Sequence, residues 1–427
     1  MVSPVWHPFT QHAIAPDPIA VERAEGAYLY TEDGQRIIDA ISSWWVISHG
    51  HGHPEIVRAV QEQAGKLDQV IFAGFTHEPA EMLAERLIDL SEGAFDHVFY
   101  SDSGSTAVEV ALKMAIGYWE HNGQPRHKII AFEGGYHGDT FGTMSAGGRS
   151  VYNKLYEPFL FDVEHIPVPV RGKEADALTR LEDVLKANRD QVAAFIFEPL
   201  VLGAGGMVMY SAETLKAMVD LARAYDVLLI ADEVMTGFGR TGSLFASQQA
   251  GFMPDIMCLS KGLSGGFLPL GATLCHGRIY DAFYHQDKAK MFFHSSSFTG
   301  NPLACAAANA SLQIWQDEPV QARIEGIRKL HSDAIAEFEA RGDVTNIRQC
   351  GTILAMDVVV SQDGYLSDIQ PKLYDLFLSR KVLLRPLGNT VYILPPYCIT
   401  EEDLREIYDS IHFALDSVRY EGQQRAV

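Results

Sequence analysis

The stretch DIMCLSKGLSGGFLPLG, residues 255–271, joins an apolar run to a lysine and a cluster of glycines. The run IMCLS (256–260) is typical of a strand, and GATLC (271–275) begins a second strand directly after the glycines. Glycines allow the backbone to turn tightly and to approach a ligand closely. The segment therefore predicts a strand, a sharp turn that carries Lys261, and another strand.

Similar strand-like runs recur earlier in the chain. They are HVFYS (97–101), KIIAF (128–132), AAFIFE (193–198) and VLLIADE (227–233). Helical patterns lie between them; residues 211–226, for example, repeat apolar side chains at helical spacing behind a Ser-x-x-Thr start. The alternation predicts an α/β fold in which a mostly parallel sheet is wrapped by helices.

The two ends of the chain show a different pattern. Residues 27–40 predict a hairpin that turns at Asp33-Gly34, and residues 320–427 predict the order helix, strand, helix, strand, helix. We expect these ends to meet in a second, smaller α/β domain. The expected division is a large domain at 46–315 and a small domain made of 1–45 and 316–427.

The composition limits the class of protein. The 427 residues are 47% hydrophobic and 21% charged, as in ordinary soluble globular proteins. Lys and Arg number 34 against 55 Asp and Glu, and a net charge of -21 argues against a nucleic-acid partner, which needs a basic face. Five widely spaced cysteines suggest neither a disulfide framework nor a zinc site, and no signal peptide or membrane span is visible. We expect a cytoplasmic protein that binds small molecules and no membrane.

Polar residues that follow the predicted strands are the first candidates for a site, because ligands of open α/β sheets bind at the carboxyl ends of strands. After HVFYS, the residues Ser103, Gly104, Ser105 and Thr106 lead into a helix, whose N–H groups and dipole suit a phosphate; a plain helix cap is the alternative. After KIIAF, two glycines precede Tyr136, which offers either a face for a flat ligand or a buried structural ring.

Two charged residues follow the next strands. Asp232 closes LLIAD, where a buried carboxylate is costly unless it meets a positive partner or a hydrogen-bond donor. Lys261 follows IMCLS, and desolvation there lowers the pKa of an amine, as a nucleophilic lysine requires. A surface position is the alternative for the lysine, and its place between an apolar run and a glycine-rich turn weakens that alternative.

Together the four features fit pyridoxal 5'-phosphate (PLP). This cofactor has a phosphate, a flat ring, a pyridine nitrogen that must stay protonated, and an aldehyde that condenses with lysine. A serine hydrolase is the competing hypothesis, because Gly262 to Gly266 spell G-x-S-x-G around Ser264. That pattern is weak in a chain with 36 glycines and no obvious H-G-G-G oxyanion loop.

The segments LLIADEVMTGFGRTGSLFA (228–246) and PDIMCLSKGLSGGFLPLGA (254–272) resemble the signature block of the class III aminotransferases, which have PLP fold type I. The likeness extends over nearly the whole chain. It implies a PLP-dependent aminotransferase with a mostly parallel seven-stranded sheet in its large domain and a smaller α/β domain built from both chain ends.

The resemblance also implies roles for residues at matching positions. Lys261 is the expected Schiff-base lysine and acid/base, and Asp232 is expected to hold the pyridine nitrogen. Gly104 and Ser105 are expected to bind the phosphate. Tyr136 is expected to lie close to the ring and to the substrate.

Part of the cofactor site is expected to come from a neighbouring subunit. In FFHSSSFTGNP (292–302), Ser296 and Ser297 fall where the family binds the phosphate across the subunit boundary, which implies a homodimer with shared active sites. The chain departs from the family here, because Ser295, Ser296 and Ser297 stand where a member of the class has Gly-Pro-Thr. Ser297 keeps a hydroxyl for the phosphate, whereas Ser295 places bulk beside the substrate.

Three further residues are expected on the substrate side. Trp44 of SSWW resembles the family's wall for the substrate chain, with core filling as the alternative for one of Trp44 and Trp45. Arg385 resembles the partner of a substrate carboxylate, which an arginine can bind through two hydrogen bonds. Phe9 stands in place of a family tyrosine, so that a hydroxyl that contacts the substrate is missing. Arg240 matches an arginine near the site without a catalytic role.

Within the class, the segments WHPFT (6–10) and SSWWVISHGHGHP (42–54) resemble the branch that serves biotin synthesis. This implies ping-pong transfer of an amino group from S-adenosyl-L-methionine to 8-amino-7-oxononanoate. The alternative is another ω-aminotransferase of the class, with 4-aminobutyrate, ornithine, lysine or a diamine as donor. The alternating histidines of the second segment have no carboxylate or cysteine beside them, so a loop is expected there and no metal site.

Overall fold

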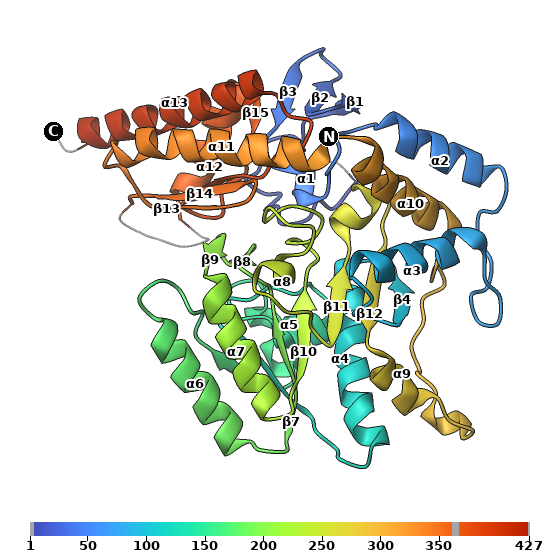
Figure 1. Ribbon diagram of the computed structural model, residues 1–427. Coiled ribbons are helices and arrows are strands. Elements are labelled where there is room, and N and C mark those ends of the chain that lie inside the picture. Colours follow the sequence, from blue (N-terminus) through green and yellow to red (C-terminus); the bar gives the residue numbers. More distant parts are fainter. Residues whose placement is uncertain (1–3, 361–366, 426–427) are drawn as a thin grey trace.

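The computed structural model describes residues 4–360 and 367–425, and its largest sheet has seven strands in the order β4-β12-β11-β10-β7-β5-β6 (Figure 1). Strand β12 is antiparallel to both of its neighbours, and the other pairs are parallel. The expected mostly parallel sheet is therefore confirmed. Its strands are β4 (His97–Ser101), β5 (Lys128–Phe132), β6 (Glu164–Ile166), β7 (Val192–Phe197), β10 (Leu228–Asp232), β11 (Ile256–Leu259) and β12 (Gly271–Cys275).

The apolar runs in the sequence predicted every strand of this sheet except β6. That edge strand consists of only Glu164, His165 and Ile166, which is too short and too polar to show a strand pattern. The central strands β7, β10 and β11 are buried along their whole length. Continuous burial is expected for parallel strands that are covered on both faces, and it explains why their sequences are apolar throughout.

Helices cover both faces of the sheet. Along β7, Phe195 and Phe197 pack in one hydrophobic cluster with α7 (Ala212–Ala224), whereas Ala194 and Ile196 pack in another with α4 (Gly104–His121). Successive residues of a strand point to opposite faces, so α7 and α4 lie on opposite sides of the sheet. In Figure 1, α6 (Glu174–Ala187) lies beside α7.

The first turn of α7 shows why the sequence pattern predicted a helix there. The side chain of Ser211 accepts a hydrogen bond from the backbone N–H of Thr214, as a helix cap does. The remaining elements of this part of the chain are α1 (Ser42–Trp45), α2 (Pro54–Ala64), α3 (Glu78–Leu90), α5 (Phe141–Ala146), α8 (Ala246–Gln249), α9 (Gly277–Phe283), α10 (Pro302–Asp317), η1 (Lys154–Phe159), η2 (Lys261–Ser264), η3 (Lys288–Lys290), β8 (Val201–Leu202) and β9 (Val208–Met209).

The two chain ends meet in a four-stranded sheet of order β1-β2-β3-β15. The expected hairpin joins β2 to β3 and turns at Gly34, whose φ of 81° is left-handed. Residues Val382 and Leu383 then pair in parallel with Ile38 and Asp39. These strands are β1 (Val21–Glu25), β2 (Tyr28–Thr31), β3 (Arg36–Asp39) and β15 (Val382–Leu383).

The C-terminal part differs from expectation in its number of strands. Two strands, and not one, follow each of the helices α11 and α12, because β13 and β14 form a hairpin and β16 pairs with β14. The elements are α11 (Val320–Glu339), β13 (Val344–Cys350), β14 (Ile353–Val358), α12 (Ile369–Ser379), β16 (Thr390–Ile393) and α13 (Glu401–Arg425), and Figure 1 shows the three helices together at one end of the molecule. The domain boundaries given above stay a prediction.

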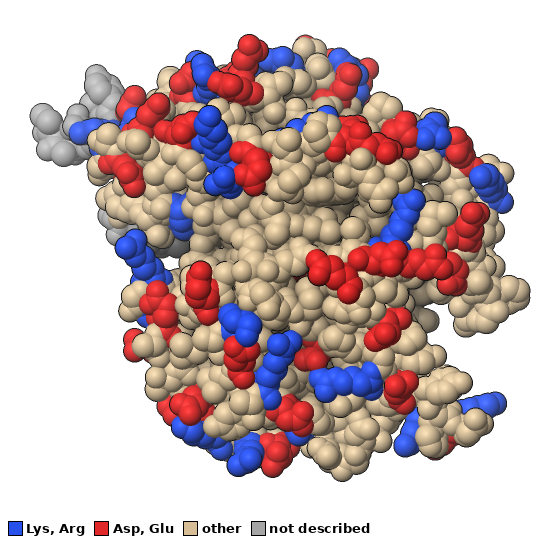
Figure 2. Space-filling view, viewed as in Figure 1, with Lys and Arg blue, Asp and Glu red and all other residues tan. Residues whose placement is uncertain are grey.

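The surface and the helices show two further features. Figure 2 shows side chains of both charges scattered over one face around an uncharged central region. Among the helices of residues 4–360 and 367–425, none is long and apolar enough to cross a membrane.

Arg240 connects both chain ends to the centre of the fold. Its guanidinium is buried and donates to the carbonyl of Ile47 over 2.8 Å and to the carbonyl of Pro395 over 2.7 Å. It also lies over the ring of Tyr397, 4.9 Å from the centroid. One side chain thus holds an N-terminal and a C-terminal segment beside the loop that follows β10.

Replacing Arg240 with Met is expected to lower the free energy of unfolding by about 2–5 kcal/mol, because two buried carbonyls lose their donors. Urea unfolding measures this change. The control is Arg58→Met, since the Arg58 side chain is 61% exposed and its pairs with Glu55 and Glu62 lie on the surface. That change is expected to stay within about 0.5 kcal/mol. Equal losses for the two variants would contradict the linking role of Arg240.

Candidate active site

A cavity of about 430 Å³ lies at the carboxyl ends of β10 and β11. This volume is in the range of small-molecule sites. Of the eleven residues that the sequence predicted for the site, the cavity wall contains Phe9, Trp44, Gly104, Ser105, Tyr136, Asp232, Lys261 and Arg385. The three serines Ser295, Ser296 and Ser297 are not on this wall.

Lys261 enters the cavity from a strained turn. Strand β11 ends at Leu259, and Lys261 opens η2 with a φ of 46°, a left-handed value that is unusual for a residue with a side chain. The turn closes at Gly266, where φ is +82° and a Cβ would lie only 2.5 Å from the carbonyl oxygen of Val46. The glycines after the lysine therefore serve the tight turn.

The surroundings of Lys261 favour a neutral amine. Its Nζ lies 4.8 Å from the centroid of the Trp45 ring. Burial lowers the pKa of Lys261 to about 8, although the carboxylates of Asp232 and Glu198 act in the opposite direction. An amine of this kind is more often deprotonated near neutral pH than an exposed lysine, as a nucleophile or general base requires.

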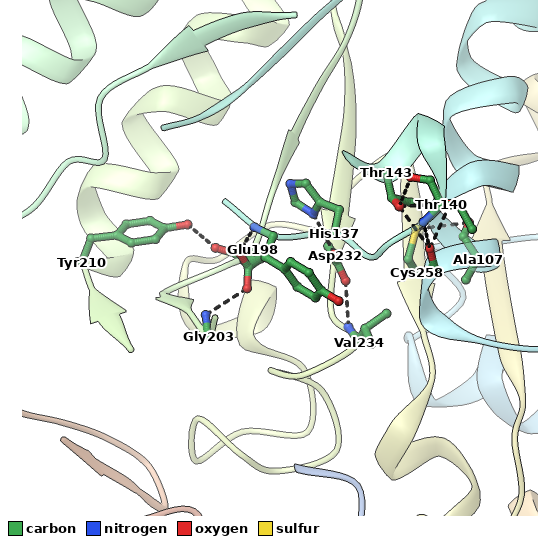
Figure 3. Close-up of polar contacts among 12 residues, drawn as sticks. Ala107, His137, Thr140, Thr143, Glu198, Gly203, Tyr210, Asp232, Val234 and Cys258 are labelled. Atoms are coloured by element: carbon green, nitrogen blue, oxygen red, sulfur yellow. Dashed lines mark hydrogen bonds and ion pairs between the residues drawn. The ribbon is translucent and has the colours of Figure 1, made fainter. Parts of the chain in front are cut away.

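Asp232 is the last residue of β10, and its carboxylate is almost fully buried at the cavity wall. Its Oδ2 lies 2.7 Å from Nδ1 of His137, and its Oδ1 accepts the backbone N–H of Val234 over 3.1 Å (Figure 3). These contacts fix the plane of the carboxylate. They also supply the donors that a buried carboxylate at the end of an apolar strand needs.

Sequence reasoning missed His137 and Glu198, which both lie on the cavity wall. Glu198 directly follows β7, and its two oxygens accept the backbone N–H groups of Tyr136 and Gly203, each over 2.9 Å. Burial raises the pKa of Glu198 to about 7. A signal was present in the sequence, because Glu198 ends the apolar run AAFIFE just as Asp232 ends LLIAD.

The first turn of α4 forms another part of the cavity wall. Ser103 is the cap of this helix and accepts the N–H of Thr106, so the capping interpretation is right for Ser103. Gly104 and Ser105 begin the helix on the cavity wall. The first N–H groups of a helix have no partner within it, so this end suits an anion.

The loop that carries Tyr136 packs directly on this helix. The hydroxyl of Ser105 contacts the hydroxyls of Thr140 and Thr143 over 2.9 and 3.0 Å. Gly138 has a φ of +131°, and a Cβ there would overlap the side chain of Ser105. The loop can therefore pass this close to the helix only with a glycine at position 138.

Aromatic rings form the outer wall of the cavity. Trp44 is 46% exposed. Its ring centroid lies 5.7 Å from the ring centroid of Phe9 and 5.8 Å from Cζ of Arg385. Tyr152, which the sequence did not single out, stands edge-on to Phe9 at 6.0 Å. Trp45 is the buried member of the tryptophan pair and donates its indole N–H to the hydroxyl of Tyr392 over 3.0 Å.

The segment that carries these two tryptophans has an unusual backbone. Ser42, Ser43 and Trp45 have positive φ values of 53°, 58° and 64°. The buried carboxylate of Asp39 holds this segment, because it accepts the N–H of Ser43 over 2.8 Å and its hydroxyl over 2.9 Å. Such strain persists where surrounding contacts enforce it, and here it turns Trp44 toward the cavity.

The three nearby histidines bind different partners. His51 Nε2 lies 2.8 Å from Oδ2 of Asp39, His49 Nε2 lies 3.2 Å from the hydroxyl of Ser311, and His53 Nε2 lies 3.0 Å from Glu318. Each of these rings therefore takes part in a separate contact that holds the loop.

The serine run contacts other parts of the same chain. The hydroxyl of Ser296 donates to the carboxylate of Asp102, and the carbonyl of Ser297 accepts from the side chain of Gln69 over 2.9 Å. Their assignment to the cofactor of a neighbouring subunit stays a prediction.

Ser264, the nucleophile of the competing hydrolase hypothesis, is buried and donates to the carbonyl of Leu268 over 2.6 Å. It is not on the wall of the cavity. The hydrolase hypothesis therefore lacks an accessible nucleophile.

The residues of the wall fit PLP. The anion-binding end at Gly104 and Ser105, the ring of Tyr136, the carboxylate of Asp232 and the amine of Lys261 all face one cavity. Each matches one chemical feature of the cofactor, namely its phosphate, its ring, its pyridine nitrogen and its aldehyde.

Comparison with known proteins gives a consistent result. Residues 10–415 match the family described as aminotransferase class-III. The chain is 49% identical to adenosylmethionine-8-amino-7-oxononanoate aminotransferase of Synechococcus elongatus, over 97% of this chain and 99% of that protein. The solved structure of the enzyme of that name from Methanocaldococcus jannaschii superposes with a TM-score of 0.92 at 33% identity, covering 97% of each chain. An amine transaminase from an uncultivated Pseudomonas species, solved in its PLP-bound form, has a TM-score of 0.92 at 31% identity and covers 97% of this chain and 99% of its own.

Replacing Lys261 with Met is expected to stabilise the cofactor-free protein by about 2 kcal/mol at neutral pH, because the wild type must keep a poorly solvated ammonium there. The pKa of Lys261 is about 8 in the folded chain against 10.5 for an ordinary lysine, so the unfolded chain binds more protons between these values. Wild-type stability therefore rises with pH in this window, and the advantage of the variant fades.

Urea unfolding of the cofactor-free proteins at several pH values measures this trend. The matched control is Lys216→Met at an exposed helix position, where the change is expected to stay below about 0.5 kcal/mol. A gain for Lys261→Met that does not depend on pH would show that the ammonium is well solvated.

Proposed function

This chain belongs to the class III aminotransferases, and we propose that it transfers an amino group from S-adenosyl-L-methionine to 8-amino-7-oxononanoate, giving 7,8-diaminononanoate in biotin biosynthesis. Its family makes it a PLP-dependent transaminase. The proposal for the substrates is carried by the relative from Synechococcus elongatus, which is 49% identical over nearly the whole of both chains and has the corresponding name.

The wall of the cavity supports this type of chemistry. PLP supplies an aldehyde for the amino group and a ring that accepts electrons. Lys261 is the acid/base: its amine, with a pKa lowered to about 8 by burial, can both take and return a proton near neutral pH. Asp232 would accept a hydrogen bond from the protonated pyridine nitrogen and so keep that nitrogen charged, while His137 holds the carboxylate in place.

The substrates are bound at the aromatic side of the cavity. Arg385 pairs with the carboxylate that donor and acceptor have in common, which explains how one pocket serves both halves of a ping-pong reaction. Trp44 and Phe9 line the path of the substrate chain, and Phe9 has no hydroxyl to offer. A second cavity of about 260 Å³ shares Tyr136, Asp139 and Tyr152 with the first, and so leaves room for a bulky donor.

The active enzyme is a homodimer in this proposal. Ser296 and Ser297 do not line the cavity of their own chain, which fits a role at the cofactor phosphate of a second copy. The neighbouring Phe293 and Phe298 are 65% and 61% exposed, which is a large apolar surface to leave in water. We place this dimer in the cytoplasm, where free thiols such as the buried Cys258 and Cys305 are kept reduced.

A second candidate is an ω-aminotransferase that acts on other amines. It is favoured by one observation, the superposition on the amine transaminase of the Pseudomonas species with the same TM-score of 0.92. The fold is therefore common to both candidates, and only the substrates distinguish them.

A panel of amino donors with 8-amino-7-oxononanoate as acceptor tests the substrates. S-adenosyl-L-methionine is expected to give 7,8-diaminononanoate, measured by mass spectrometry, whereas 4-aminobutyrate and ornithine are expected to give none. If lysine gives the product and S-adenosyl-L-methionine does not, the proposed acceptor and product stand and only the proposed donor is wrong. Failure of every donor, together with activity on 4-aminobutyrate or ornithine, would support the second candidate.

Two variants serve as controls for this panel. Lys261→Ala is expected to lose at least ~10²-fold in turnover, because no other residue of the wall replaces its proton transfer. Ser264→Ala is expected to keep activity within about twofold, since the hydrogen bonds of the Ser264 hydroxyl go to the backbone of Leu268 and not into the cavity. The opposite pattern would revive the hydrolase hypothesis.

Mixed dimers test the shared site. Ser297→Asp is expected to repel the cofactor phosphate of the other subunit, and Lys261→Ala inactivates its own subunit. If the sites are shared, each mixed dimer contains one intact site, and co-expression of the two variants should restore about one quarter of the wild-type activity. No recovery, although mixed dimers are isolated by two affinity tags, would show that Ser297 does not act across the boundary.

A further inference from the structure

Glu198 is a buried carboxylate for which the reaction proposed above has no use. It lies at the end of β7, next to β10 in the sheet, and only 6% of its surface is exposed. Its oxygens accept the N–H groups of Tyr136 and Gly203, and its own carbonyl accepts the hydroxyl of Tyr210 over 2.7 Å (Figure 3). Glu198 therefore ties the loop that carries Tyr136 and His137 to the sheet.

His137 lies between this carboxylate and that of Asp232. Its Nδ1 binds Asp232, whereas its buried Nε2 has no hydrogen-bond partner among the described residues. A Cβ built on Gly135 would lie 3.5 Å from Nε2 of His137 and 4.0 Å from Oε1 of Glu198, so these two atoms lie close to one common point. Nε2 and the Glu198 carboxylate therefore both lie close to this point, where their charges interact although no hydrogen bond joins them.

The charge of His137 decides whether this arrangement is favourable. A neutral imidazole that donates to Asp232 leaves a lone pair on Nε2 near a second carboxylate, whereas an imidazolium places a positive charge close to both acids. Burial opposes the charged form, but the hydrogen bond to Asp232 and the charges of Asp232 and Glu198 outweigh it, and the pKa of His137 is raised.

We propose that Glu198 is a positioning residue that, together with Asp232, keeps His137 doubly protonated in a buried Asp232–His137–Glu198 array. The array holds the Asp232 carboxylate in one orientation, as the partner of a protonated pyridine nitrogen would require. The inference rests on the proposed function only in taking that nitrogen as the partner of Asp232.

The titration of Glu198 explains why the array survives at alkaline pH. An ordinary histidine loses its proton near pH ~6.5. Burial raises the pKa of Glu198 to about 7, so its negative charge develops where the imidazolium would otherwise be lost. The two titrations are coupled, and the new charge retains the proton on His137. Lys261 and Tyr136 also face this region; Lys261 favours the ionised carboxylates, and burial raises the pKa of Tyr136, which stays neutral.

The Nε2–H resonance of His137 in ¹⁵N-edited NMR spectra of the PLP-bound enzyme tests the proposal, because the doubly protonated ring carries this proton, whereas a neutral ring that donates through Nδ1 does not. The resonance is assigned to His137 if it is absent from the spectrum of His137→Asn. In the wild type the resonance is expected to persist to a higher pH than in Glu198→Gln, because the charge of Glu198 helps to raise the pKa of His137. Glu198→Asp keeps the charge and is expected to retain the signal to a higher pH than Glu198→Gln does.

The matched control is Glu233→Gln. Glu233 is also a fully buried carboxylate and is adjacent to Asp232 in the chain, but it binds Thr236, Ala246 and Ser247. Its replacement is expected to lower stability and to leave the resonance unchanged. A wild-type resonance that disappears near pH ~6.5, or one that persists equally in Glu198→Gln, would overturn the proposal.

Steady-state kinetics give a second readout. Glu198→Gln is expected to lose about tenfold in kcat at pH ~8.5 relative to pH ~6.5, with little dependence of KM for the donor on pH, because the pH-dependent effect passes through His137 and Asp232. A loss that is equal at both pH values would reduce Glu198 to a structural role. The NMR test needs no substrate, so it stands even if the donor panel contradicts the proposed substrates.

Discussion

The buried carboxylate of Asp232 is the group on which the rest of the site depends. A charge at the end of an apolar strand is stable only with donors around it, and here the imidazole of His137 and the N–H of Val234 supply them. These partners must in turn be held, and Glu198 holds the loop that carries His137 by accepting the backbone N–H of Tyr136. One electrostatic requirement thus determines the placement of an aromatic ring, an imidazole and a second acid.

The parallel sheet makes this arrangement possible. Strands β7, β10 and β11 lie side by side and run in the same direction, so the residues that follow them, Glu198, Asp232 and Lys261, reach one edge although they are far apart in the chain. The chain ends complete the site from the other side. Arg240 fixes both ends to the loop after β10, and so the tryptophan segment and Arg385 close the outer wall.

Much of this could be predicted from residues alone, and the failures have physical causes. The apolar runs identified the strands that are buried on both faces, whereas the three-residue edge strand β6 had no pattern to detect. Eight of the eleven predicted site residues line the cavity, because a lysine or an acid at the end of an apolar strand is costly without a function. Glu198 also ends an apolar strand and was overlooked. No sequence pattern marks His137 or Tyr152, because their importance lies in the residues that they contact.

The sequence by itself determined the fold class, the aminotransferase family and most of the residues that line the cavity, because these follow from local patterns: apolar strands, the polar residues after them, and glycines where the turn is tight. Only the tertiary structure decided which neighbours those residues have. It buried Trp45 and exposed Trp44, it turned Ser264 toward a carbonyl, and it brought Glu198 beside His137. Such pairings join residues that are distant in the chain, and their energies depend on distance and burial, which a linear pattern does not contain.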